Sequence, residues 1–141
     1  MREIKFRAWD KEINKMIYSN EAYPRSSYKF EFDIVNNFEF TLSKIIDRFN
    51  VKDEEGEDYC IDCYEKVDAE IMQYTGLEDR NGKEIYEGDI VEFYSLSEDG
   101  ITLGVVSYDE GMYIIGDYIL RKHIRSCAVK GNIYENPELL K

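Results

Sequence analysis

Apolar and polar side chains alternate strictly over residues 28–34, where every second residue is apolar. A period of two residues is typical of a strand with one buried face. Residues 4–9 alternate in the same way, and a second apolar run at 16–18 follows the polar loop 10–15. We therefore expect the first two strands to be adjacent and antiparallel. The apolar positions of the clearest alternation are Tyr28, Phe30, Phe32 and Ile34.

Residues 41–49 follow a different period. Their apolar side chains are spaced i, i+3, i+4 and i+7, which places them on one stripe of a helix. Thr41 or Ser43 can supply the N-cap. The spacing predicts a short helix near 41–49, and this is the one helix that we expect. The apolar positions are Leu42, Ile45, Ile46 and Phe49.

The stretch 71–93 contains two turn signals between runs of strand-favouring residues. Asn81-Gly82 is the strongest short signal for a hairpin, because a tight two-residue turn needs positive φ at both central positions. Gly88-Asp89 redirects the chain into a new strand, and Gly111 marks a later turn. Short strands separated by glycine-marked turns roughly every ten residues are typical of a small antiparallel barrel or sandwich.

Four blocks of sequence carry a family resemblance. They are IKFRAWD at 4–10, MQYTGL at 72–77, NGKEIYEGDIV at 81–91 and GNIYENPEL at 131–139. As a set they resemble the YopX family of phage and prophage proteins. The resemblance implies a mostly β protein with an SH3-like C-terminal part and no established catalytic activity, so it supplies no catalytic residues.

The predicted fold class is mainly β and antiparallel, in two lobes. We expect residues 1–70 to form an N-terminal β-rich lobe that contains the short helix. We expect residues 71–141 to form an SH3-like β-barrel lobe with an extended C-terminal tail. A chain of 141 residues is long enough for one domain or for two small lobes.

The charge of the chain limits its partners. The net charge is −12, and residues 51–70 alone carry nine acidic and two basic side chains. Such a chain repels phosphate backbones at long range, which disfavours binding of nucleic acid without regard to sequence. The simpler interpretation of the excess of acidic residues is that it keeps the protein soluble. A surface that imitates DNA and blocks a basic host protein is a second interpretation.

Nothing in the sequence predicts a membrane segment or an export signal. There is no run of about eighteen apolar residues, as a membrane-spanning helix would need. Three of the first five residues are charged, and the N-terminus lacks the apolar core of a signal peptide. We therefore expect a cytoplasmic protein, which for a phage protein means the host cell.

Three cysteines and one histidine are the candidates for a metal site. Four such ligands can close a tetrahedral zinc site. If Cys60 and Cys63 lie on one strand, however, they point to opposite faces because their spacing is odd. We expect free thiols, with no metal and no cofactor. The four residues are Cys60, Cys63, His123 and Cys127.

No sequence feature points to catalysis. The chain lacks the glycine motifs that bind nucleotide phosphates, and nothing beside His123 indicates a group that orients it as a base. We predict that the chain has no catalytic residues and is not an enzyme.

Aromatic residues make up 14% of the chain, and exposed aromatics on β surfaces mark subunit contacts or stacking platforms for bases. The second half also contains one basic cluster, for which a solvated face is the simpler interpretation. The candidate interaction residues are Trp9, Tyr18, Tyr94, Tyr113, Arg121, Lys122 and Arg125.

These observations predict a non-enzymatic protein-interaction module that forms a homo-oligomer and binds a host or phage protein. A nucleic-acid-binding SH3-like module and an acidic DNA mimic that inhibits a host DNA-binding protein are the alternatives.

Overall fold

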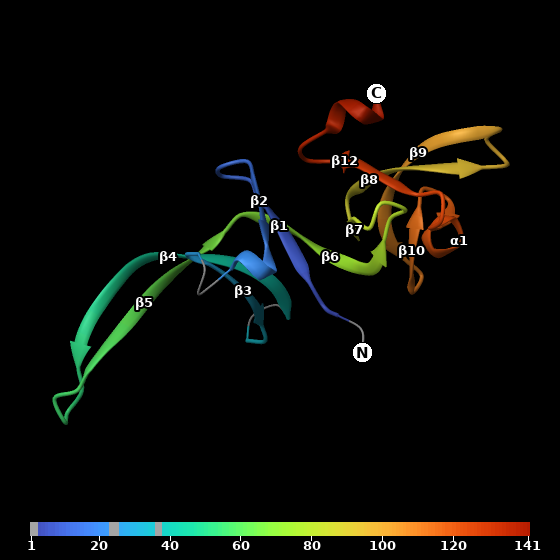
Figure 1. Ribbon diagram of the computed structural model, residues 1–141. Coiled ribbons are helices and arrows are strands. Elements are labelled where there is room, and N and C mark those ends of the chain that lie inside the picture. Colours follow the sequence, from blue (N-terminus) through green and yellow to red (C-terminus); the bar gives the residue numbers. More distant parts are fainter. Residues whose placement is uncertain (1–2, 23–25, 36–37) are drawn as a thin grey trace. The chain divides into compact units, whose positions relative to one another are not determined.

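The computed structural model describes residues 3–22, 26–35 and 38–141 (Figure 1). The chain divides into two compact units. The N-terminal unit is Arg7–Ile71, and the C-terminal unit is Met72–Lys141 together with the residues up to Phe6. The elements of the described residues are, in order, β1 (Phe6–Asp10), β2 (Lys15–Tyr18), η1 (Ser19–Glu21), β3 (Tyr28–Asp33), β4 (Glu39–Lys52), β5 (Asp58–Val67), β6 (Ala69–Glu78), β7 (Glu84–Tyr86), β8 (Asp89–Ser95), β9 (Gly100–Asp109), β10 (Met112–Ile115), β11 (Tyr118–Ile119), α1 (Leu120–His123), β12 (Ala128–Asn132) and η2 (Pro137–Leu140).

The strand pairs are antiparallel, which confirms the predicted mainly β fold class with a small barrel in the C-terminal half. Among the described residues, no helix combines the length and the apolar character that crossing a lipid bilayer requires.

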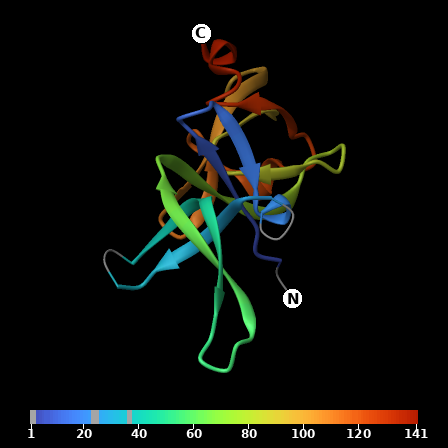
Figure 2. The same cartoon turned by 90° about the vertical axis from the view of Figure 1, so that its left-hand side faces the viewer.

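In the N-terminal unit, β1 and β2 form the predicted hairpin, with Ala8 opposite Ile17. The strands β3, β4 and β5 form a separate sheet in that order, and the β4–β5 hairpin projects past the end of β3 (Figure 2). Ala8 and Ile17 pack with Leu42 of β4 and Val67 of β5 in one buried cluster. The β1–β2 hairpin therefore covers the middle of the β3–β4–β5 sheet.

A partly buried hydrogen bond joins the hairpin to the sheet. The Tyr28 hydroxyl of β3 donates to the carboxylate of Asp10 at 3.0 Å, and Asp10 is fully buried. The other oxygen of Asp10 accepts from the backbone N–H of Glu12 at 2.9 Å. Burial, together with the hydrogen bond to Asp10, raises the pKa of Tyr28 to about 12. The hydroxyl therefore remains a donor at physiological pH.

The prediction of a helix over 41–49 is wrong, because these residues lie inside strand β4. The register of β4 against β5 shifts between Ile45 and Asp47, which marks a β-bulge. One extra residue in a strand changes the alternation by one position. Leu42 and Phe49, seven residues apart, therefore face the same side of the sheet. The bulge gives a strand the apolar spacing of a helix, and the only α-helix of the described residues is α1.

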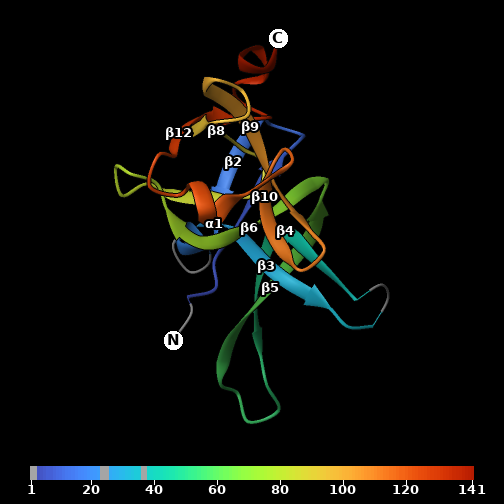
Figure 3. The same ribbon diagram turned by 90° about the vertical axis from the view of Figure 1, so that its right-hand side faces the viewer.

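The C-terminal unit contains a curled antiparallel sheet in the order β11-β10-β9-β8-β12 (Figure 3). Gly104 of β9 is needed for close packing, because a Cβ there would lie 2.4 Å from Cγ2 of Ile115. Helix α1 packs beside β10 and buries Leu120. The buried cluster at the centre of this small barrel is Ile85, Val91, Phe93, Val106, Ile115, Leu120 and Cys127.

The Asn81-Gly82 hairpin signal is correct in position, but the turn differs in geometry. Only Gly82 has positive φ, at 79°, and its N–H donates to the carbonyl of Asp79. The carboxylate of Asp79 accepts backbone hydrogen bonds from Asn81 and Lys83 across the turn, and from Val129 of β12. These bonds stabilise a longer turn, so Asn81 does not need the left-handed conformation of a two-residue hairpin.

The prediction of an extended C-terminal tail is wrong. The Asn132 side chain accepts hydrogen bonds from the backbone N–H groups of Tyr134 and Glu135, which closes a turn directly after β12. The chain then enters the 3₁₀ helix η2 with a proline in its first turn, a position that proline favours.

We predict that Asp79→Asn destabilises the C-terminal unit. Burial alone would raise the pKa of Asp79, but the hydrogen bonds from Val129, Lys83 and Asn81 outweigh burial and lower it. The ionised carboxylate therefore stabilises the fold above the unfolded value of 3.8, and this stability is lost as pH falls through the folded pKa. An amide accepts through only one oxygen, so we expect a loss of about 2 kcal/mol at pH 7.

Urea unfolding at pH 7 and at pH 3 measures this effect. The stability gap between the wild type and Asp79→Asn should narrow at pH 3, because the carboxylate of the unfolded chain is then protonated and part of the stabilisation by the ionised form is lost. The exposed Asp109→Asn is the control and should change little. An Asp79→Asn protein as stable as the wild type at pH 7 would contradict the role given to this carboxylate.

Candidate functional site

The β4–β5 hairpin continues as a two-stranded arm where β3 ends. Strand β3 pairs with β4 only as far as Lys44, opposite Tyr28. Beyond Lys44, β4 pairs with β5 alone, up to Lys52 opposite Asp58. We call residues 45–64 the arm. An isolated pair of strands is at best marginally stable in water, so the arm needs further contacts to be well ordered.

One face of the arm is apolar and open to solvent. Phe49 of β4 stands opposite Ile61 of β5, and Val51 stands opposite Tyr59. Phe49 is 51% exposed, Tyr59 49% and Ile61 43%. Side chains on one strand alternate between faces, so Tyr59 and Ile61 share the face that carries Val67. The exposed arm face is therefore a continuation of the face that forms the core.

The opposite face of the arm is polar and internally paired. The Arg48 guanidinium makes two hydrogen bonds to the Asp62 carboxylate, at 2.6 and 3.4 Å. Lys52 forms an ion pair with Asp58 at 2.9 Å. This face has the charged and hydrogen-bonded composition of a solvent-facing surface. The apolar face is therefore the one that no described element of this unit covers.

The tip of the arm, residues 53–58, is strongly acidic. Five of its six residues are Asp or Glu, and the sixth is Gly56. The Asp53 carboxylate accepts backbone hydrogen bonds from Glu55 and Glu57 at 2.9 and 2.8 Å, which orders the turn. The Glu54 and Glu55 side chains are exposed and free to meet a partner.

A groove lies in the C-terminal unit between β6 and the β9–β10 hairpin. It has a volume of about 560 Å³ and is open on one side. Its apolar lining comes from Leu77, Met112, Tyr113 and Ile119, and Arg121 is the one charged residue among those that line it. The groove therefore suits an apolar group that also carries negative charge.

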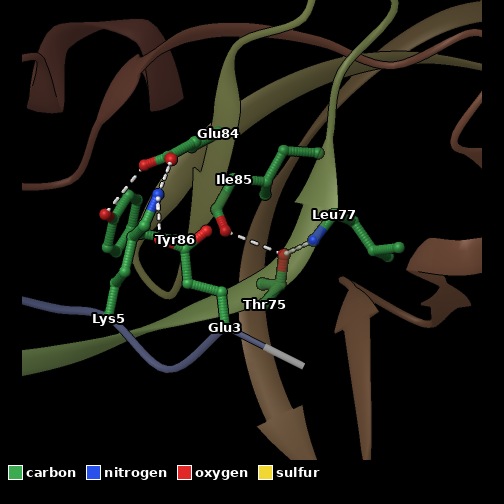
Figure 4. Close-up of polar contacts among 7 residues, drawn as sticks. All are labelled: Glu3, Lys5, Thr75, Leu77, Glu84, Ile85 and Tyr86. Atoms are coloured by element: carbon green, nitrogen blue, oxygen red, sulfur yellow. Dashed lines mark hydrogen bonds and ion pairs between the residues drawn. The ribbon is translucent and has the colours of Figure 1, made fainter. Parts of the chain in front are cut away.

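An irregularity in β6 forms one wall of this groove. The pairing of β6 with β7 shifts between Tyr74 and Glu78. Within the gap, the Thr75 hydroxyl donates to the carbonyl of Ile85 at 2.8 Å and accepts from the N–H of Leu77 at 3.2 Å (Figure 4). The Thr75 side chain replaces the missing backbone pairing, so the chain can bend at Gly76, whose φ is +82°.

The same part of the structure anchors the N-terminal segment. The Lys5 carbonyl accepts a hydrogen bond from the N–H of Tyr74 at 2.9 Å. Figure 4 shows the Lys5 ammonium between the carboxylates of Glu3 and Glu84, while the Tyr86 hydroxyl donates to Glu84. The bond to Lys5 lowers the pKa of Glu84, so this contact is present at neutral pH.

The residues predicted as an interaction surface are divided between the two units. Trp9 and Tyr18 are half-buried in β1 and β2 of the N-terminal unit, and Tyr113 packs against the barrel core. Tyr94 of β8 is 51% exposed. The basic cluster of Arg121, Lys122 and Arg125 is exposed on and after α1. Only Tyr113 and Arg121 of the seven line the groove.

The predicted interaction residues do not include Phe49, Tyr59 or Ile61, which form the open face of the arm. The alternation of Tyr59, Ile61 and Cys63 is visible in the sequence. Alternation identifies an apolar face, but it does not tell whether another element covers that face.

The cysteines and the histidine are divided between the two units. Cys60 and Cys63 both lie on β5, where their odd spacing directs them to opposite faces. Burial raises the pKa of the Cys127 thiol to about 11. His123 contacts the rings of Phe93 and Tyr118, and one ring nitrogen lies 3.2 Å from the carbonyl of Tyr94. No group of three His, Cys, Asp or Glu side chains among the described residues could hold a metal ion.

We predict that Thr75→Val destabilises the C-terminal unit by about 2 kcal/mol, because it leaves the buried carbonyl of Ile85 and the N–H of Leu77 without their partner. Valine keeps the shape of threonine, so packing changes little. Thr102→Val on β9 is the matched control and should change stability by less than about 0.5 kcal/mol. Equal urea midpoints for the two variants would contradict the role of the Thr75 hydroxyl.

Comparison with known proteins agrees with this architecture. The family model described as YopX protein matches residues 5–141. Protein EF1440 from Enterococcus faecalis is 28% identical, with both chains covered completely and a TM-score of 0.65. Protein YopX from Bacillus subtilis has a similar fold at 20% identity, with a TM-score of 0.59 over 97% of this chain and 95% of that one. Among curated proteins there is no significant match. The chain belongs to the YopX family.

Proposed function

We propose that this protein is a non-enzymatic interaction module that self-associates, and that the apolar face of the arm is its contact surface. The observation that carries the proposal is the exposure of Phe49, Tyr59 and Ile61 on a strand pair whose other face is already ion-paired. Clustered exposed apolar side chains mark interaction sites, because their burial is favourable.

A second copy of the chain is the partner that fits best. The same face of the sheet is exposed at its other end, where the Phe32 and Phe40 rings lie 5.4 Å apart. A half-exposed aromatic side chain leaves on the order of 100 Å² open. These side chains together offer several hundred Å² per copy, which approaches the roughly 800 Å² per partner of a specific interface. Further copies of the chain are also present in any cell that makes the protein.

The reactive groups support a binding function over catalysis. Acid–base and nucleophilic catalysis need a group activated by its neighbours. The buried Cys127 is held in the thiol form, and the imidazole of His123 contacts aromatic rings and a backbone carbonyl. We therefore propose an accessory phage protein that acts by contact with other proteins in the host cytoplasm.

We predict that the double variant Phe49→Thr with Ile61→Thr weakens self-association at least about tenfold, because both side chains lose apolar contact area. Threonine is favoured in strands, so the arm should keep its pairing. Sedimentation velocity over a wide range of concentrations measures the association.

Lys52→Thr is the control, since Lys52 lies on the polar face of the same arm. It should associate like the wild type. A wild-type protein that stays monomeric at high concentration would falsify the proposal, as would a double variant that associates unchanged.

Nucleic-acid binding is the second candidate function. The observation in its favour is that Arg121, Lys122 and Arg125 are exposed and form no ion pair with a described residue. Three basic side chains act against a net charge of −12, so we expect no retention of single-stranded DNA on a column of the protein at low salt. Retention that Arg121→Glu abolishes would favour this candidate instead.

A further inference from the structure

The C-terminal unit carries a basic surface beside its groove. Between Asp117 and Glu135 the sequence contains no acidic residue, although the chain has 30 acidic residues in all. This segment includes the basic cluster, and Arg121 reaches the groove itself. The rest of the groove lining is uncharged. An apolar groove with one positively charged side chain in its lining favours a partner that is both apolar and acidic.

The tip of the arm has the complementary composition. Its acidic residues directly precede Tyr59 and Ile61, which are half-exposed on the apolar face. No other six-residue stretch of the chain contains five acidic residues. The chain thus has an acidic and apolar projection in one unit and a basic and apolar groove in the other.

From this complementarity we infer that the arm of one copy docks in the groove of a second copy. The tip carboxylates meet Arg121, Lys122 and Arg125, and Tyr59 and Ile61 contact the apolar lining. This inference rests on the proposed self-association and specifies its partner surface. Buried apolar area supplies affinity, while the opposite charges fix the orientation and register of the arm.

The inferred contact joins two different surfaces. Such a head-to-tail contact either closes into a ring, of which a dimer with two reciprocal contacts is the smallest, or continues as an open filament.

Charge reversal on each surface provides the test. The tip variant is Glu54→Lys with Glu55→Lys and Glu57→Lys, which makes the tip net basic and keeps Asp53 and its hydrogen bonds to the backbone of the turn. The groove variant is Arg121→Glu with Lys122→Glu. Each variant alone has like charges on its arm and groove, so we expect its self-association to weaken at least about tenfold.

An equal mixture of the two variants is the decisive sample. The basic tip of one variant then meets the acidic groove of the other, and the acidic tip of the second meets the basic groove of the first. We expect the mixture to recover the wild-type sedimentation coefficient, with the two variants at a ratio of 1:1 when one is labelled. Recovery by mixing cannot arise from a contact within one copy.

A variant with Lys15→Glu and Lys141→Glu has the same net charge as the groove variant and is the control. It should associate like the wild type. The inference is overturned if the mixture stays dissociated, if either variant alone associates like the wild type, or if the wild type is a monomer. In the first two cases self-association through the arm can still stand, whereas in the last the proposed function also fails.

Discussion

A β-sheet needs a cover over its apolar face, and in the N-terminal unit the cover is shorter than the sheet. Ala8 and Ile17 bury Leu42 and Val67, which are 1% and 2% exposed. The same face continues along the arm to Phe49, which no described element of its unit buries. The bulge in β4 makes this continuation possible, because it turns Phe49 to the same face of the sheet as Leu42. The self-association that we propose rests on this difference in length.

The C-terminal unit satisfies the same requirement within itself. Its strands close around one cluster, and where backbone pairing is interrupted, side chains replace it. Thr75 does so in β6, and Asp79 does so where a turn meets β12. The result is a well-packed barrel with an open groove, whose positively charged residue contrasts with the acidic arm. The N-terminal unit thus offers an acidic and apolar arm, and the C-terminal unit offers an apolar groove lined by Arg121.

Local patterns predicted much of this fold. Alternation located the β1–β2 hairpin and β3, and glycine-marked turns indicated the small barrel. The helix over 41–49 was mistaken because a bulge in a strand and a helical stripe space apolar residues alike. The contacts of Asp79 with Val129, 50 positions away, depend on tertiary structure that no local pattern contains. The sequence did not predict the arm as a candidate site. The alternation at Tyr59 and Ile61 identifies an apolar face, but it does not show whether another element covers that face.

Amide hydrogen exchange of the wild-type protein as a function of concentration tests the central claim most directly. A two-stranded arm without a partner opens easily, so its amides exchange fast. We predict that amides at 47–51 and 59–63 become protected as concentration rises and the protein associates, while amides beside Leu42 and Val67 are protected throughout. Arm amides that exchange at the same rate in the associated and the dissociated protein would contradict the account.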